Sequence, residues 1–177
     1  MKKFHLLLLV LFFAPLTFSQ LPTFKLGVGA STGIPMGAFS DWYNTGFGAH
    51  ATLIFPTPVV EVSATVGYLS FGSKVTGASA LSLVPITANA RYYFSPVALR
   101  PYGEVSAGLG IMSGGGSSET KHHIAIGVGI LTDLAPKIDL DVNAKYNLMG
   151  HKFYDSSSPD GSAGTYLGIN AGIRFKL

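Results

Sequence analysis

Residues 164–177 read GTYLGINAGIRFKL, and this stretch decides the fold. From position 167 onward every second residue is apolar, and the residues between them are small or polar. The apolar set is Leu167, Ile169, Ala171, Ile173, Phe175 and Leu177. Strict alternation with a period of two is typical of a β-strand that has one apolar face. We therefore expect a strand that closes the chain.

Seven earlier segments repeat this alternation. They are residues 23–31, 46–55, 59–71, 81–94, 100–112, 122–133 and 137–149. In the last of these, Val142 stands between Asp141 and Asn143, so one face is apolar and the other is polar. Pro85 interrupts the fourth segment, where we expect a bulge or a missing ladder bond. The sequence thus predicts eight strands.

The connections between these strands alternate in length. Long polar connections cover residues 32–45, 72–80, 113–121 and 150–163, and the short ones contain Pro56, Pro58, Pro96 and Pro136. Short turns at one end and long loops at the other are expected of an outer-membrane barrel. The predicted fold is all-β: an eight-stranded antiparallel up-and-down transmembrane β-barrel with both chain ends on the periplasmic side.

A soluble, lipocalin-like barrel would also alternate, with its apolar face inside. The membrane is favoured because the strands reach the ~9 to 11 residues needed to cross a bilayer at a tilt. The polar face is rich in Gly, Ser, Thr and Asn, which suit a crowded lumen. Aromatic residues near the strand ends predict two girdles. The short-turn girdle comprises Phe55, Tyr92, Tyr93, Phe94, Tyr102 and Phe175, and the other comprises Phe47, Tyr68, Phe71, Phe153, Tyr154 and Tyr166.

The N-terminus has the features of a secretory signal peptide. Lys2 and Lys3 precede an apolar run, and small residues lead to a cleavage site that we expect before Gln20. The apolar run is shorter than the ~20 residues of a membrane-spanning helix. We therefore assign residues 1–19 to a signal peptide and residues 20–177 to one barrel domain.

Composition agrees with an exported strand-and-turn protein. The 177 residues include 22 glycines, 10 prolines and no cysteine, and only 12% are charged, against a usual ~25%. Without disulfides, the exported chain must be held by its own hydrogen bonds and packing. The formal net charge of +3 includes two lysines of the signal peptide, so nothing favours nucleic acid as a partner.

The whole mature chain resembles the small bacterial outer-membrane β-barrels of the OmpA/OmpX type, also known as the porin family or the outer membrane protein β-barrel domain. The segments that carry this resemblance are GVGA at 27–30, ANARYYF at 88–94, PYG at 101–103 and GIRFKL at 172–177. In that family the closing strand also serves as the assembly signal. This chain ends in Leu177, whereas a terminal Phe is commoner in the family.

Residues with catalytic or cofactor chemistry are few. The GVG motifs at 27–29 and 127–129 lack the third glycine and the helix of a dinucleotide loop. His122 and His123 are adjacent in a strand, so they face opposite sides and cannot grip one metal ion. The nearest approach to a His-x-Ser arrangement is His50-Ala51-Thr52, and a Thr is a weak nucleophile without a positioned base. We expect no catalytic, cofactor or metal site.

The charged residues of the polar face predict a structural cluster inside the barrel. Its expected members are Lys25, Glu61, Arg91, Glu104, Asp139, Asp141, Lys145 and Arg174, with Lys176 at the same depth. The strand order lets Arg91 meet Glu61 or Glu104, and lets Arg174 meet Asp139 or Asp141. Arg suits this role because its planar fork can satisfy a carboxylate with two hydrogen bonds. Above this charge-paired plug, Gly108, Gly110, Gly127 and Gly129 predict a shallow cavity open to the outside.

These observations predict an integral outer-membrane protein with a structural or loop-mediated interaction role and no catalysis. A small porin-like transport barrel is one alternative, although eight strands leave an interior only wide enough for side chains. A lipid A-modifying enzyme is the second. The expected partners are outer-membrane lipid and lipopolysaccharide, the barrel-assembly machinery during insertion, and an extracellular partner reached through the long loops, where Trp42, Phe153 and Tyr154 lie.

Overall fold

The computed structural model describes residues 24–57, 59–95, 98–155 and 158–176, which form a closed barrel of eight strands and one short helix. The elements are β1 (Lys25–Met36), α2 (Ala38–Trp42), β2 (Tyr43–Phe55), β3 (Val60–Ser73), β4 (Leu81–Tyr93), β5 (Leu99–Gly114), β6 (Ser117–Ala135), β7 (Ile138–Asp155) and β8 (Ser158–Lys176). The predicted signal peptide, Pro58, Pro96 and Leu177 lie outside the described residues.

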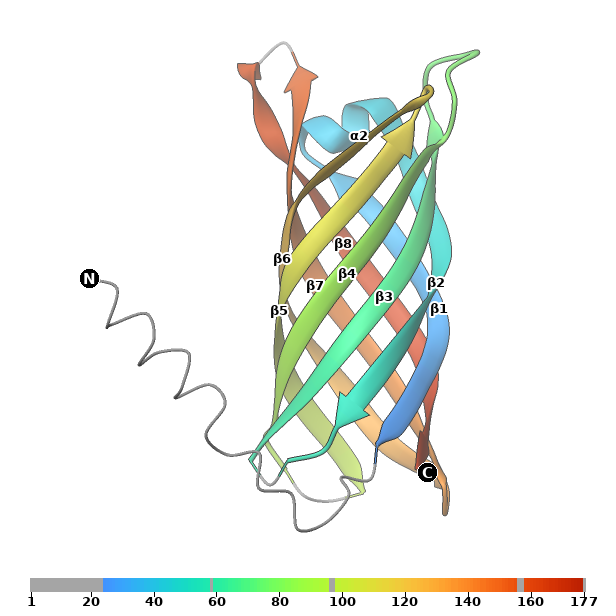
Figure 1. The fold of residues 1–177 in the computed structure, drawn as a ribbon, viewed down its shortest axis with the longest axis vertical. Coiled ribbons are helices and arrows are strands. Elements are labelled where there is room, and N and C mark those ends of the chain that lie inside the picture. Colours follow the sequence, from blue (N-terminus) through green and yellow to red (C-terminus); the bar gives the residue numbers. More distant parts are fainter. Residues whose placement is uncertain (1–23, 58, 96–97, 156–157, 177) are drawn as a thin grey trace, which may run out of the picture.

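Each strand pairs antiparallel with the next, and β8 returns to pair with β1 (Figure 1). Val28, for example, lies opposite Ile173 on β8 and Ala51 on β2. Closure removes the free sheet edges, so every strand has a ladder partner on both sides. The predicted antiparallel up-and-down barrel is confirmed.

Alternating residues face the outside and the lumen, as the sequence pattern predicts. On β3, Glu61 and Ser63 are buried, whereas Val62 between them is 44% exposed. The same parity gives the outside an apolar belt, with Leu26, Val28, Val66, Ile86, Val105, Leu109, Ile124, Ile126, Val128, Ile130, Val142 and Ile169 all exposed. An apolar outside and a polar inside are required of a membrane barrel and are the reverse of a lipocalin-like one.

The two ends of the barrel differ. Short connections join β2 to β3, β4 to β5 and β6 to β7 at the end that we name the short-turn rim; α2 lies at the other end, named here the helix rim (Figure 1). Pro56 and Pro136 lie in these short connections, as predicted. Among the described residues, none of the helical segments is long and apolar enough to span a membrane.

The strands near the helix rim are longer than predicted. Residues 117–121 belong to β6, and most of residues 150–163 belong to β7 and β8, so the long loops expected there are wrong. Only Gly115 and Gly116 separate β5 from β6, with φ of 59° and 84°. That pair matches the left-handed conformation of a two-residue hairpin turn. In residues 117–121 the alternation is absent because both faces of this end of β6 are exposed.

The first long connection, 32–45, is also mostly regular structure. β1 continues to Met36, α2 follows, and β2 starts at Tyr43. Gly37 precedes the helix with φ of 55°, a conformation that favours glycine. Ala38 and Phe39 on the helix are buried. The turn-forming residues of this segment predicted a loop, whereas the structure has a short helix whose Phe39 side chain is buried at the end of the barrel.

The predicted girdles are only partly correct. Phe55, Tyr92, Phe94, Phe47, Tyr68 and Tyr154 are half-buried or exposed on the outside, and two edge-to-face pairs, Phe24–Phe55 and Tyr92–Phe94, lie near the short-turn rim. By contrast, Tyr93, Tyr102, Phe71, Phe153 and Tyr166 belong to the lumen side. In the alternation of their strands these residues fall on the polar, lumen-facing side. The alternation therefore predicted the direction of an aromatic side chain better than nearness to a strand end did.

For Pro85 we predicted either a bulge or a missing ladder bond. The structure shows the missing ladder bond and no bulge. The β3–β4 partners run from Val66–Ile86 directly to Leu69–Leu83, with the register unchanged on the two sides. Pro lacks the N–H that a ladder bond needs, which explains the gap.

Candidate functional site

Buried charges cross the lumen in one layer near the short-turn rim. This charge layer consists of Glu61 on β3, Arg91 on β4, Glu104 on β5, Asp141 and Lys145 on β7, and Arg174 on β8, together with the phenol groups of Tyr93 and Tyr102. Alternation aims each of these side chains inward. The layer contains three carboxylates and three cations, so its formal charges balance.

Arg91 joins three strands. Its Nε donates to Glu104 Oε2 at 2.7 Å, and its Nη1 donates to Asp141 Oδ2 at 2.9 Å. The Arg91 Cζ also lies 3.7 Å from the centre of the Tyr102 ring, which is the geometry of a cation–π contact. Tyr102 in turn donates its hydroxyl to Asp141. The guanidinium is thus surrounded by charge and by an aromatic face.

Arg174 makes a matching set of contacts from the other side of the barrel. Its Nε donates to Asp141 Oδ2 at 2.8 Å, its Nη1 donates to Glu61 Oε1 at 2.9 Å, and the same Nη1 reaches the Tyr93 hydroxyl at 3.2 Å. Only 3% of Arg174 is exposed. The contact with Glu61 joins β8 to β3, two strands that are not neighbours.

Lys145 completes the layer through an ion pair with Glu104. Gly127 and Gly129 on β6 make room for two members of the layer. A Cβ added at Gly127 would lie 2.7 Å from Lys145 Cγ, and one added at Gly129 would overlap the ring of Tyr102. The glycines thus accommodate side chains that cross over them, which explains their occurrence inside strands.

A second, smaller cluster lies closer to the short-turn rim. Lys176 Nζ is 2.7 Å from both Asp133 Oδ1 and Asp139 Oδ1, and Arg100 Nη2 is 2.9 Å from Asp133 Oδ1. Lys25 Nζ is 3.9 Å from Asp139 Oδ2. Asp133 is exposed at the rim, where its neighbours, above all the hydrogen bond from Lys176, lower the pKa of its carboxyl group to about 2.

The structure therefore divides the predicted cluster in two. Glu61, Arg91, Glu104, Asp141, Lys145 and Arg174 meet in the charge layer, whereas Lys25, Asp139 and Lys176 meet at the rim. Arg174 contacts Asp141 rather than Asp139, although Asp139 is its ladder partner. Sequence reasoning missed Arg100, Tyr93 and Tyr102. Arg100 and Tyr102 have the parity of Glu104 on the same strand, which was the signal that could have found them.

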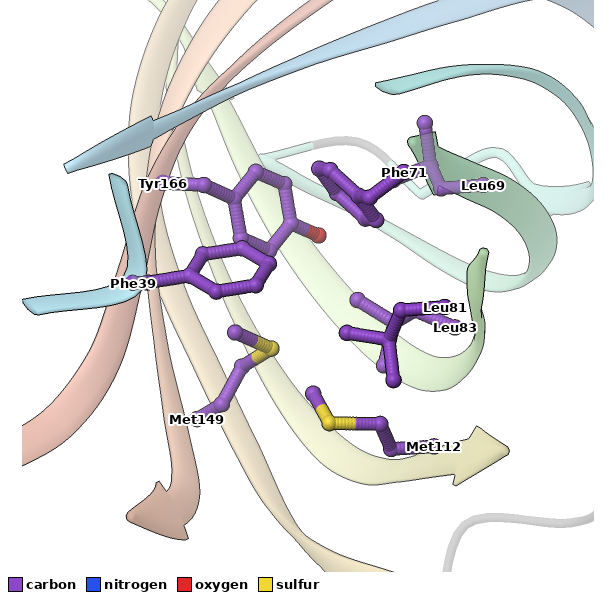
Figure 2. Close-up of a cluster of buried hydrophobic side chains, with 8 residues drawn as sticks. All are labelled: Phe39, Leu69, Phe71, Leu81, Leu83, Met112, Met149 and Tyr166. Carbon is purple, nitrogen blue, oxygen red and sulfur yellow. The ribbon is translucent and has the colours of Figure 1, made fainter. Parts of the chain in front are cut away.

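Apolar side chains fill the lumen at the helix rim. This apolar cap consists of Phe39, Leu69, Phe71, Leu81, Leu83, Met112, Met149 and Tyr166 (Figure 2). The Phe39 ring centre is 5.1 Å from that of Phe71 and 4.6 Å from that of Phe153. Gly33 and Gly46 lie against the Phe71 ring and leave space for it.

A cavity of about 80 Å³ lies between the charge layer and the apolar cap. Arg91, Glu104 and Arg174 line it on one side, and Leu69 and Tyr166 of the cap line it on the other. A cavity above the charge layer is therefore present, as predicted, but the apolar cap covers it toward the helix rim and Gly108, Gly110, Gly127 and Gly129 do not line it. The glycines that line the observed cavity are Gly27, Gly67, Gly168 and Gly172.

His122 and His123 point in opposite directions from β6. His123 faces the lumen, where its Nε2 is 3.1 Å from Asn147 Oδ1, whereas His122 is exposed and packs over Gly150. Their opposite directions are those that strand geometry predicts. In the described part of the chain, no group of three or more His, Cys, Asp and Glu side chains could hold a metal ion.

His50 contacts a serine that the sequence did not single out. Its Nδ1 is 2.9 Å from Ser31 Oγ on β1, while Thr52 instead contacts Thr65 at 3.0 Å. Ser31 and His50 are diagonal neighbours on paired strands, so the contact cannot be read from one strand alone. Among the described residues no carboxylate is hydrogen-bonded to His50, so the third group that would orient a catalytic base is missing.

Solved structures that resemble this chain are small outer-membrane barrels. Neisserial surface protein A is 19% identical, with a TM-score of 0.69 and coverage of 88% of this chain and 97% of that one. OprG from Pseudomonas aeruginosa is 12% identical (TM-score 0.57; 89% and 97%), and Ail from Yersinia pestis is 18% identical (TM-score 0.52; 88% and 100%). At these identities the likeness shows the fold alone.

No curated protein matches the sequence. The family model described as the outer membrane protein beta-barrel domain matches residues 4–175, nearly the whole chain. The resemblance noted in the sequence is thereby confirmed, and the outward apolar belt agrees with an outer-membrane location. The chain belongs to the outer membrane protein beta-barrel domain family.

Proposed function

We propose that this protein is a closed outer-membrane barrel with a structural or interaction role and no catalysis, exported by residues 1–19. The observation that supports this proposal is that side chains fill the lumen at two levels. The charge layer crosses it near the short-turn rim, and the apolar cap crosses it at the helix rim. A solute would have to displace both, because the interior of an eight-stranded barrel is only just wide enough for side chains to fill it.

The helix rim supports the interaction role. In small barrels the end opposite the short turns faces the outside of the cell. Trp42 and Tyr154 are 44% and 57% exposed there, and Trp42 Nε1 donates to the Tyr154 carbonyl oxygen at 2.8 Å. Lys74, in the connection from β3 to β4, donates to the Ser40 carbonyl oxygen. These bonds tie three connections together, and an ordered surface loses less entropy when it binds a partner.

Lipid and lipopolysaccharide are the partners proposed for the outside of the barrel, which carries the apolar belt and the aromatic pairs Phe24–Phe55 and Tyr92–Phe94. The proposed partner during insertion is the barrel-assembly machinery. Its recognition signal would be the outward face of β8, which includes Ile169, Ile173 and Phe175.

Electrical recording tests the closed state. Purified protein in a planar lipid bilayer should give no large, stable conductance steps. Such steps would contradict the proposal and support a small transport barrel instead. Incubation with lipopolysaccharide, followed by mass spectrometry, should show unaltered acyl chains, and added or removed chains would indicate a lipid A-modifying enzyme.

A further inference from the structure

The cavity between the charge layer and the apolar cap has a polar lining. Ser31, His50, Thr52, Thr65 and Asn143 all face it. A buried water needs ~10 to 15 Å³ and two to four polar partners, so about 80 Å³ with this lining holds roughly five water molecules.

His123 gives an independent reason to place water here. Asn147 Nδ2 donates to the Lys145 and Tyr166 carbonyl oxygens, which leaves Asn147 Oδ1 to accept from His123 Nε2. In the neutral ring, Nδ1 is then an acceptor. His123 lines the cavity and is 2% exposed, and its Nδ1 has no partner among the described residues. An orphaned buried acceptor costs free energy that a donated water hydrogen bond would recover.

The two ends of the cavity are closed by different kinds of structure. The charge layer is made entirely of side chains from barrel strands that are fixed by their ladders. In the apolar cap, Phe39 alone comes from α2, and Figure 2 shows its ring entering among side chains from the wall. Phe39 is fully buried, so its removal would open the centre of the cap.

The attachment of α2 to the rim contains fewer charged contacts than the charge layer does. The helix has five residues, begins after Gly37 and has no side-chain N-cap. Its polar ties to the rest of the rim are hydrogen bonds between uncharged acceptors and a few donors: Trp42 Nε1 donates to the Tyr154 carbonyl oxygen, and Lys74 donates from Nζ to the Ser40 carbonyl oxygen and from its backbone N–H to the Trp42 carbonyl oxygen. Displacing it would break fewer interactions than opening the charge layer, where each guanidinium contacts two or more carboxylates.

We propose that the cavity is a hydrated chamber for water and water-sized polar solutes, entered at the helix rim, with Phe39 as its stopper. The proposal rests on the closed barrel of the proposed function. It adds that the two barriers differ: displacement of α2 opens the apolar cap, whereas the charge layer stays closed.

The absence of cysteine from the chain permits a direct test. Thr52→Cys places one thiol on the chamber wall, and Ser31→Cys is a second reporter in case the first does not fold. The rate of modification by a small, charged methanethiosulfonate is measured on the folded barrel in detergent. We expect slow modification in the parent background and roughly tenfold or faster modification with Phe39→Ala, because removal of the stopper raises the population of open chamber.

Two control variants locate the entrance. Phe47→Ala removes an exposed ring from the outside, and Tyr93→Ala removes a lumen ring at the opposite end of the chamber. Phe47→Ala should leave the rate unchanged, and Tyr93→Ala, which removes one hydrogen bond of the charge layer, should raise it much less than Phe39→Ala does. Fast modification in the parent, an unchanged rate with Phe39→Ala, or acceleration by Tyr93→Ala alone would each overturn the proposal. Conductance by the parent would instead refute the closed barrel, so the two failures are distinguishable.

Discussion

Arg91 and Glu104 are ladder partners on β4 and β5, and Arg91 Nε donates to Glu104 Oε2 at 2.7 Å inside the barrel. Both side chains are buried. A soluble protein of this size has an apolar core, whereas here a charge-balanced layer crosses the lumen and an apolar surface faces outward. Each charge is tolerable only because its partners are in place.

The outward apolar face predicts a dependence on depth. Val142→Arg and Ile126→Arg put a charge near the middle of the belt, where it should lower the free energy of unfolding by about 2 to 4 kcal/mol. Leu134→Arg, on the exposed end of β6, should cost about 0 to 1 kcal/mol. Urea titration of the refolded protein in lipid vesicles measures both. Equal costs at the two depths would mean that this face does not span the membrane.

The packing of Tyr102 over Gly129 predicts that this glycine cannot be replaced. In Gly129→Ala the new Cβ would overlap the Tyr102 ring and lie 2.7 Å from Asn143 Cβ. Tyr102 is held by Arg91 and Asp141, so overpacking should cost about 1 to 3 kcal/mol in the same unfolding measurement. Gly72→Ala is the control, since its Cβ would have only ordinary contacts. A stable Gly129→Ala variant would show that Tyr102 is free to move.

The rim cluster predicts a pH effect with a definite sign. The hydrogen bond from Lys176 is the largest of several causes, with the charge of Arg100 among them, that lower the pKa of Asp133 from 3.8 to about 2. The folded pKa is depressed, so the stabilisation is present above the unfolded value near 3.8 and is lost as the pH falls toward 2. NMR titration of the Asp133 carboxyl carbon should show the low midpoint, and Lys176→Gln should move it upward. A midpoint near 3.8 in the parent would argue against the bond.

Much of the fold could be predicted because successive residues of a barrel strand face the lipid and the lumen in turn, so their hydrophobicity alternates. Val142 and Asn143 differ in hydrophobicity because one faces lipid and the other faces the lumen. The alternation is lost where both faces of a strand are exposed, so the sequence of residues 117–121 did not indicate a strand. Phe39 was missed for a related reason: its surroundings come from tertiary packing rather than from local periodicity.

The site could be predicted only in part. The order of the strands predicted that Arg91 could reach Glu61 or Glu104 on the adjacent strands, and the structure shows a hydrogen bond to Glu104. The contact of Arg174 with Glu61 crosses the barrel, so it depends on the tilt of the strands and the length of the side chains, which no local pattern reveals. The contact of Ser31 with His50 depends on the register of β1 and β2 in the same way.

The most direct test of the charge layer is urea unfolding in detergent of Arg91→Ala, Arg174→Ala and the surface variant Lys121→Ala. Truncating one partner of a desolvated pair leaves the other charge stranded, so each Arg variant should lose about 3 to 5 kcal/mol. Among the described residues Lys121 pairs with the exposed Glu119, and its loss should cost less than about 1 kcal/mol. If all three variants unfold like the parent, the charge layer does not hold the barrel together and the lumen is better described as filled with water.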